Sequence, residues 1–136
     1  MSAEQTYDYA VIRVVPRVDR GERINVGVIL SCPGADFLEA RIELDEALLL
    51  ALDPAVDVAE VRANLGVIPS VCRGGESAGP IGALDARSRF RWLVSPRSTM
   101  IQPSAVHTGC TSDPVRCLEQ LMNRVVRRSP GYEHAS

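Results

Sequence analysis

The sequence predicts an α+β fold: an N-terminal antiparallel β-meander of about three strands, then helices, one further extended segment and a C-terminal amphipathic helix. Two patterns support this prediction. Runs of β-branched and aromatic residues separated by short turns occupy residues 7–44, and apolar residues at helical spacings dominate much of the remainder. Because the turns are too short for parallel crossovers, we expect antiparallel pairing. A chain of 136 residues fits one domain, placed here at residues 1–128, with a mobile tail at residues 129–136.

Three segments carry the strand signal. Residues 7–17 alternate between two faces that are both largely apolar, which is typical of an interior strand covered on both sides. Residues 24–32 form a second strand that ends at Pro33 and Gly34, a strong turn signal. Residues 37–44 alternate cleanly between polar and apolar side chains. This third strand should therefore have one face toward solvent and one toward the core.

Helices are predicted where a capping carboxylate precedes an apolar stripe. Asp45 can cap a short helix, and Asp53 followed by Pro54 repeats the helix-start signature for a second one. The second helix should bend or end early at Gly66 and Pro69, because both residues disfavour a helix interior. Its apolar stripe consists of Val58, Val61, Leu65, Ile68 and Cys72.

The second half of the chain begins less regularly. Residues 73–82 contain four glycines and are predicted as a loop, although their order differs from a phosphate-cradling GxGxxG turn. Residues 84–94 fit both a strand and a helix, and Asp85 as a cap favours the helix. Asp113 followed by Pro114 begins the final helix, whose apolar stripe is the clearest in the sequence.

Composition narrows the function classes. The net charge of −2 argues against a general nucleic-acid or anionic-membrane partner. All 15 basic residues are arginine, which excludes a lysine nucleophile, a Schiff base and a P-loop lysine. The first ten residues lack the positive start and apolar core of a signal peptide, and no apolar run is long enough to span a membrane. We therefore expect a cytoplasmic protein.

The cysteines do not predict a metal site. Their spacing forms no CxxC pair, and no other motif indicates a cofactor, so we expect neither a metal nor a cofactor. In the cytoplasm they should be reduced and should behave as small buried apolar residues. The four are Cys32, Cys72, Cys110 and Cys117.

Residues 95–109 form the candidate ligand site. Pro96 and Pro103 disfavour a helix in this stretch, and a strand from Met100 to Val106 would suit a sheet edge or a bulge. An arginine fork beside hydroxyl groups suits an anion. The alternative is a structural turn, in which the hydroxyls bond their own backbone and the arginine pairs with a carboxylate. The polar residues concerned are Arg97, Ser98, Thr99, Gln102, Ser104 and His107.

His107 is the only candidate catalytic residue, since His134 lies in the tail. Its imidazole could act as a general base, but a lone histidine is more often structural. A nucleophilic Ser98 or Ser104 would need His107 and a carboxylate around it, and the sequence has no GxSxG elbow.

Arg13 is a charge inside an apolar strand and must be paired if it is buried. Its expected partner is Asp8, Glu22 or Glu39. The alternative is that Arg13 and Arg97 together clamp an anion.

Two stretches, YDYAVIRVVPRVDRGERINVGVIL and RFRWLVSPRSTMIQPSAVHTG, resemble an uncharacterised bacterial family, domain of unknown function 3037. The resemblance extends from about Tyr7 to Val126. The family has no established activity and brings no catalytic residues. Its members are often encoded beside a small kinase-like protein of the toxin–antitoxin type. The resemblance therefore implies an accessory or regulatory module with a kinase-like protein partner.

The resemblance also implies that the two stretches meet in space, with the second lying against the first hairpin. An Arg97 more than about 15 Å from that hairpin would exclude a shared site, because extended side chains could not span the gap. The residues that would be brought together are Arg13, Arg17, Glu22 and Asn25 with Arg97, Ser98, Thr99, Gln102 and His107.

Two classes of function remain open. The first is a non-catalytic binding or regulatory module that docks a protein partner and carries an anion site at residues 95–109. The second is a small enzyme for a phosphorylated or nucleotide substrate, with Arg97 and Arg13 as anion grips and His107 as acid or base.

Overall fold

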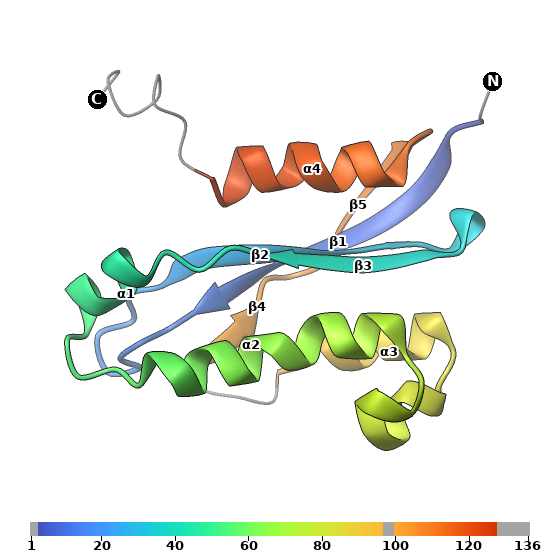
Figure 1. The fold of residues 1–136 in the computed structure, drawn as a ribbon. Coiled ribbons are helices and arrows are strands. Elements are labelled where there is room, and N and C mark those ends of the chain that lie inside the picture. Colours follow the sequence, from blue (N-terminus) through green and yellow to red (C-terminus); the bar gives the residue numbers. More distant parts are fainter. Residues whose placement is uncertain (1–2, 97–99, 128–136) are drawn as a thin grey trace.

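The computed structural model describes residues 3–96 and 100–127 and has an antiparallel sheet between two layers of helices (Figure 1). This arrangement confirms the α+β prediction, with strands first and helices after them. In chain order the elements are β1 (Gln5–Val14), β2 (Ile24–Cys32), the 3₁₀ helix η1 (Pro33–Ala35), β3 (Phe37–Ile42), α1 (Glu46–Leu52), α2 (Val58–Arg73), the 3₁₀ helix η2 (Glu76–Ala83), α3 (Ala86–Val94), β4 (Ile101–Pro103), β5 (His107–Thr111) and α4 (Pro114–Val125).

The sheet has the strand order β3-β2-β1-β4, and β5 also pairs with β1. All these pairings are antiparallel. The outer edge of β1 is therefore shared by two short strands, β4 opposite Ile12–Val14 and β5 opposite Gln5–Tyr9. The single extended segment predicted from the sequence is thus a broken strand. As predicted, it lies against the first hairpin and places Pro103 at a sheet edge.

A β-bulge in β2 changes which side chains face which layer. Ile12 pairs with Gly27 but Arg13 pairs with Asn25, so Val26 is the extra residue. The side-chain alternation therefore reverses at this point. Two sets result, one facing α2 and α3 (Ile24, Val26 and Ile29) and one facing α4 (Asn25, Val28, Leu30 and Cys32).

Two apolar clusters form the core, one on each face of the sheet. The first joins the sheet to α1, α2 and α3, with Leu49, Val61 and Phe90 among its buried residues. The second joins β2 to α4, with Leu118 and Met122 fully buried. The interior position predicted for residues 7–17 is confirmed, because β1 has helices on both sides (Figure 1).

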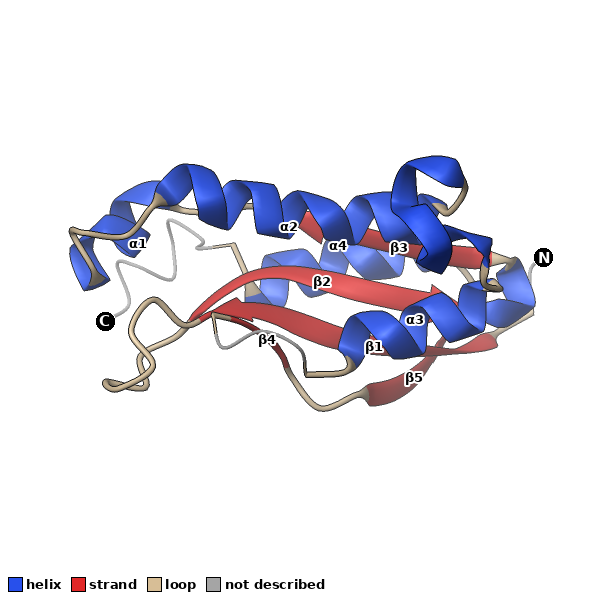
Figure 2. Cartoon of the chain, turned by 90° about the horizontal axis from the view of Figure 1, so that it is seen from below, coloured by secondary structure: helices blue, strands red, loops and turns tan. Residues whose placement is uncertain are grey.

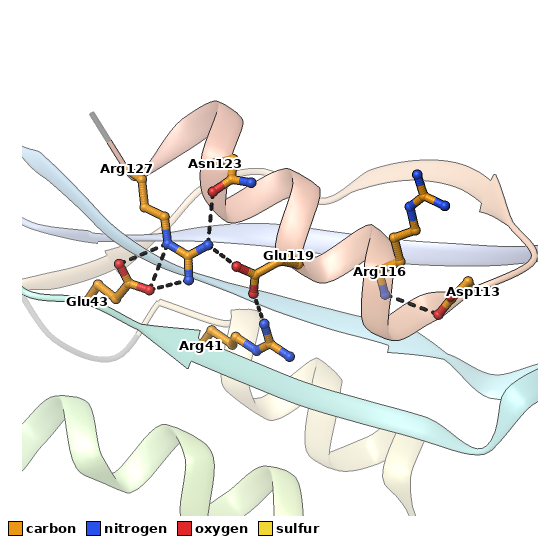
Figure 3. A network of polar contacts seen from close by, with 7 residues as sticks. All are labelled: Arg41, Glu43, Asp113, Arg116, Glu119, Asn123 and Arg127. Atoms are coloured by element: carbon orange, nitrogen blue, oxygen red, sulfur yellow. Dashed lines mark hydrogen bonds and ion pairs between the residues drawn. The ribbon is translucent and has the colours of Figure 1, made fainter. Parts of the chain in front are cut away.

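Charged side chains tie α4 to β3 (Figure 3). Glu119 on α4 accepts from Arg41 on one side and from Arg127 on the other. Arg127 continues to Glu43, with Nε 2.8 Å from Oε2, and to Asn123. Hydrogen bonding to Arg127 outweighs the opposing effect of burial and lowers the pKa of Glu43. The polar face predicted for residues 37–44 is therefore partly used to hold α4.

The helix boundaries correct the sequence prediction at two points. Asp53 ends α1, where its N–H donates to Leu49, and α2 begins after Asp57, whose side chain accepts from the N–H of Glu60. Pro69 does not end α2, which continues to Arg73. The apolar residues after the proline are buried in the core, and this packing outweighs the lost backbone hydrogen bond.

Three smaller predictions can also be compared with the structure. The helix favoured for residues 84–94 is confirmed, with Asp85 accepting from the N–H of Ser88. The stretch predicted as a loop contains η2, so that prediction was wrong in part. Cys110 is exposed, while the other three cysteines are buried as expected.

No helix in the described part of the chain has both the length and the apolar character needed to cross a lipid bilayer.

Candidate functional site

One row across the sheet contains three of the predicted site residues, Asn25, Arg13 and Gln102. Arg13 does not pair with a carboxylate in the described part of the chain. Its Nε donates to the carbonyl of Gln102 at 3.2 Å, and its Nη2 donates to the carbonyl of Pro103 at 3.1 Å. Two of the three carboxylates expected to pair with it are engaged elsewhere, Asp8 by Arg87 and Glu22 by Arg20.

Arg13 thus acts as a clamp that holds β4 onto the sheet. Its guanidinium also has a second positive charge nearby. Burial, and then the charge of Arg23, lowers the pKa of Arg13. Two cations close together favour an anion in the same region.

Arg17 and Asn25 have structural partners. Arg17 lies in the loop after β1 and forms an exposed ion pair with Asp19 at 3.0 Å. Asn25 donates from Nδ2 to the carbonyl of Val125 at 3.0 Å, which satisfies one of the last carbonyls of α4.

His107 lies apart from this row. It pairs with Tyr9 and stacks on its ring, with the ring centroids 5.2 Å apart. Tyr9 and Arg13 are four residues apart on β1, which corresponds to about 13 Å along a strand. The structure therefore does not bring His107 to Arg13, and the predicted combination of the two in one active site is not formed by the strands.

Ser104 closes the gap between β4 and β5. Its Oγ accepts from the N–H of Val11 at 2.8 Å, and its own N–H donates to the carbonyl of Val11 at 2.8 Å. The hydroxyl takes the place of a backbone acceptor where the strand is broken, so it serves the sheet rather than a nucleophilic role.

A polar cluster that the sequence did not indicate as a unit holds β5. Asp8 accepts from Thr108 at 2.6 Å and from Arg87 at 2.6 Å, and Arg87 reaches Ser31 at 3.3 Å. Burial raises the pKa of Asp8, but the hydrogen bonds from Thr108 and Arg87 outweigh it, and the net pKa is lowered. The available signal was Asp8 itself, a carboxylate on an otherwise apolar strand face.

Arg97, Ser98 and Thr99 lie outside the described residues, as does the predicted tail at 129–136. The predicted anion site and the distance test for Arg97 therefore stay predictions.

A cleft of about 240 Å³ opens between α2 and α3, beside the stretch that the sequence singled out. Figure 2 shows α2 and α3 on this face, with β1 and β2 behind them. Ile12 and Ile29 form its floor, and Ser95 and Ile101 bring both flanks of residues 97–99 to its edge. The remaining lining residues are Asn64, Val67, Ile68, Trp92, Leu93 and Pro103.

The cleft is mostly apolar and is partly open to solvent. Val67 is 47% exposed, which is high for a valine beside a core. Sequence reasoning missed this site, because it assigned the apolar residues of α2 to the core and did not consider the spacing between two helices. The chemistry of the cleft suits an apolar group, with polar atoms of Asn64 and Ser95 among its lining residues.

Comparison with curated proteins and with solved structures finds no match to the chain. A family model described as "Protein of unknown function (DUF3037)" matches residues 9–126, from the middle of β1 to the end of α4. This range includes every element that lines the cleft. The chain therefore belongs to the DUF3037 family of proteins of unknown function.

Proposed function

We propose that this chain is a non-catalytic binding module that docks a protein partner, and that the cleft between α2 and α3 receives an apolar side chain of that partner. The cleft itself carries the proposal. Its volume of about 240 Å³ lies below the roughly 300–1,000 Å³ of pockets that enclose drug-sized ligands. A cleft of this size suits one or two anchoring side chains, the units that dominate the binding energy of many protein interfaces.

The polar residues near the cleft support binding over catalysis. Arg13 and Ser104 hold the backbone of β4 and of the segment after it, and Thr108 holds Asp8. These side chains are engaged by the sheet, so the polar groups near the cleft have structural partners and the apolar lining supports the proposed contact. Trp92 and Val67 offer contact area at its wall.

Residues 97–99 of the predicted anion site suggest the rest of the contact. Ser95 and Ile101, which flank them in the sequence, line the cleft. A partner segment with an apolar anchor followed by an acidic group would suit the cleft and the predicted anion site, with Arg97, Ser98 and Thr99 as anion donors. The kinase-like protein implied by the family resemblance is the first purified partner to test.

A matched pair of substitutions tests the cleft. Val67 in the cleft and Val115 on α4 are exposed to a similar extent, 47% and 51%. Tagged wild type, Val67→Arg and Val115→Arg are used to capture proteins from the native host, read by mass spectrometry. We expect the same partner with wild type and Val115→Arg, and at least about tenfold less with Val67→Arg, because a guanidinium at the cleft opposes an apolar anchor.

Tryptophan fluorescence gives a direct signal for binding at the cleft. Trp92 is the only tryptophan in the chain, so its fluorescence reports on the cleft. Adding the purified partner should shift this fluorescence in wild type and in Val115→Arg but not in Val67→Arg. Equal capture by Val67→Arg would contradict the proposed contact.

The alternative is the small enzyme for a phosphorylated or nucleotide substrate. If no partner is captured, thermal-shift measurements with nucleotides and sugar phosphates come next. A stabilising ligand whose turnover is lost in His107→Ala, with the fold intact, would favour the enzyme. The separation of His107 from Arg13 does not support that outcome.

A further inference from the structure

The outer edge of β3 is the second feature without a described partner. β3 is the last strand of the sheet on its side. The N–H of Glu43 donates to the carbonyl of Val26 at 2.7 Å, which fixes the alternation of hydrogen bonds between β2 and β3. By this alternation the backbone groups of Leu38, Ala40 and Ile42 point away from β2. In residues 3–96 and 100–127 no other segment is paired with this edge.

We propose that a second copy of this chain pairs with β3 edge to edge, antiparallel, about a two-fold axis at Ala40. In this register Ala40 exchanges hydrogen bonds with the partner's Ala40, and Leu38 exchanges them with the partner's Ile42. The outward groups of β3 are then all used, because the three residues with free backbone are the three that the register pairs.

Charge complementarity selects this register. Glu39 lies opposite the partner's Arg41, and Arg41 lies opposite the partner's Glu39, so each copy contributes one charge to each of two cross-strand pairs. Arg41 already contacts Glu119, but a guanidinium has five N–H donors and can bind both carboxylates. A shift of the register by one residue would set each of these charges opposite an apolar residue, and a shift by two residues would set Glu39 opposite the partner's Glu39 or Arg41 opposite the partner's Arg41.

The other face of the pairing is apolar. Leu38, Ala40 and Ile42 are partly buried against the cluster beneath α2. Pairing two copies would continue this apolar layer from one sheet into the next. Under the two-fold axis, the polar face of β3 therefore continues into the polar face of the partner's β3, and the apolar face continues into the partner's apolar face.

The helix that packs beneath β3, α2, would allow a second copy of the chain to approach the β3 edge closely. α2 packs against β3, and Asn64 and Val67 on one of its flanks line the cleft. By helical periodicity the opposite flank carries the exposed residues Ala59, Ala63 and Gly66, together with Arg62, which is held in an ion pair with Glu46 of α1. Small side chains let two helix backbones come near each other, so α2 of the second copy can lie alongside.

Reciprocal charge variants test the register. Glu39→Arg alone sets guanidinium groups against each other, and Arg41→Glu alone sets carboxylates against each other. Each should weaken self-association by about tenfold or more, judged from the worth of cross-strand charge pairs. An equimolar mixture of the two variants restores opposite charges and should form a heterodimer. Ala40→Pro, which removes an outward N–H that the monomer does not use, should also give a monomer.

The measurement is sedimentation velocity of the full chain over a wide range of concentrations, with circular dichroism to show that each variant is folded. A concentration-dependent dimer that both single variants weaken and their mixture restores supports the proposal. A wild type that stays monomeric would overturn it. So would a dimer that is insensitive to these substitutions, since it would use another surface, and so would a mixture of weakened variants that fails to associate.

Discussion

The two edges of the sheet are built in different ways. On the outer side of β1, two short strands are held by side chains: Arg13 binds β4, Ser104 bridges the break, and Asp8 binds Thr108 of β5. On the other side, β3 pairs regularly with β2 over its full length, and no strand among the described residues pairs with its outer backbone groups. One edge is closed by polar side chains, and the other is regular and available.

This difference explains why so many of the polar residues near the broken strand are structural. A broken strand leaves backbone groups that regular pairing would have satisfied, and side chains must replace the missing acceptors. A regular edge strand needs no such help and keeps its side chains for other contacts. The comparison predicts different costs for substitutions at the two edges, and four of them are ordered here by expected size.

Gly27→Ala should have the largest effect. A Cβ at Gly27 would lie 2.4 Å from the carbonyl oxygen of Arg41, a backbone atom of β3 that cannot move without disturbing the β2–β3 pairing. We expect a loss of about 3 kcal/mol in the free energy of unfolding, measured by urea denaturation. Gly66→Ala is the control, because its Cβ would meet no atom within 4 Å. That helix substitution should leave stability unchanged or raise it by up to about 1 kcal/mol. Equal effects at both glycines would contradict the role of close approach.

Asp8→Asn should have the next largest effect. We expect a loss of about 1.5 kcal/mol in the free energy of unfolding at neutral pH, because the substitution removes the charge that Thr108 and Arg87 bind. The pKa of Asp8 is lowered in the folded protein, so the ionised carboxyl stabilises the fold above its ordinary pKa. This contribution is lost as the pH falls from that value through the folded pKa.

The measurement for Asp8 is denaturation of wild type and variant at pH 7 and pH 3. The difference between the two proteins should be large at pH 7 and shrink at pH 3. Glu4→Gln, at an exposed residue, gives the reference for removing a charge alone. A difference that does not change with pH would show that the charge of Asp8 is not its source.

The same contrast shows how far the sequence could predict the molecule. The regular elements were predictable, because β1, β2, β3 and α4 have clear periodicity and Asp45, Asp85 and Asp113 act as the expected caps. Local patterns could not show that Asp53 ends a helix, since the same Asp–Pro pair fits an end and a start.

The candidate site was predictable only in part. The family resemblance implied that the stretch at residues 89–109 lies against the first hairpin, and the register then brought Arg13 next to Gln102. The partner of Arg13 was missed, because backbone carbonyls carry no sequence signal. The cleft was missed for a similar reason: it depends on the distance between α2 and α3, which the periodicity of neither helix contains.

Ser104→Ala tests the sheet edge where the strand is broken between β4 and β5. It should lower the free energy of unfolding by about 1 kcal/mol, since the N–H of Val11 loses its acceptor. Hydrogen exchange at the Val11 amide should become faster, and the denaturation midpoint should fall. Ser104→Thr keeps the hydroxyl and should recover most of the loss. If Ser104→Ala leaves exchange at Val11 unchanged, the hydroxyl is not the acceptor that holds this edge.

Glu119→Gln should have the smallest effect, about 0.5 kcal/mol, because its ion pairs to Arg41 and Arg127 are partly exposed and screened by water. The loss should be seen at low salt and should diminish in concentrated salt, where the attraction is screened in wild type as well. The substitution also releases Arg41 from a competing carboxylate beside the open edge. The free energy of unfolding of the monomer should therefore fall slightly, while self-association through β3 is kept or strengthened. These opposite changes would show that the charge of Glu119 stabilises the fold and does not contribute to pairing at the β3 edge. A parallel loss of stability and self-association would mean that Glu119 positions Arg41 for the second copy.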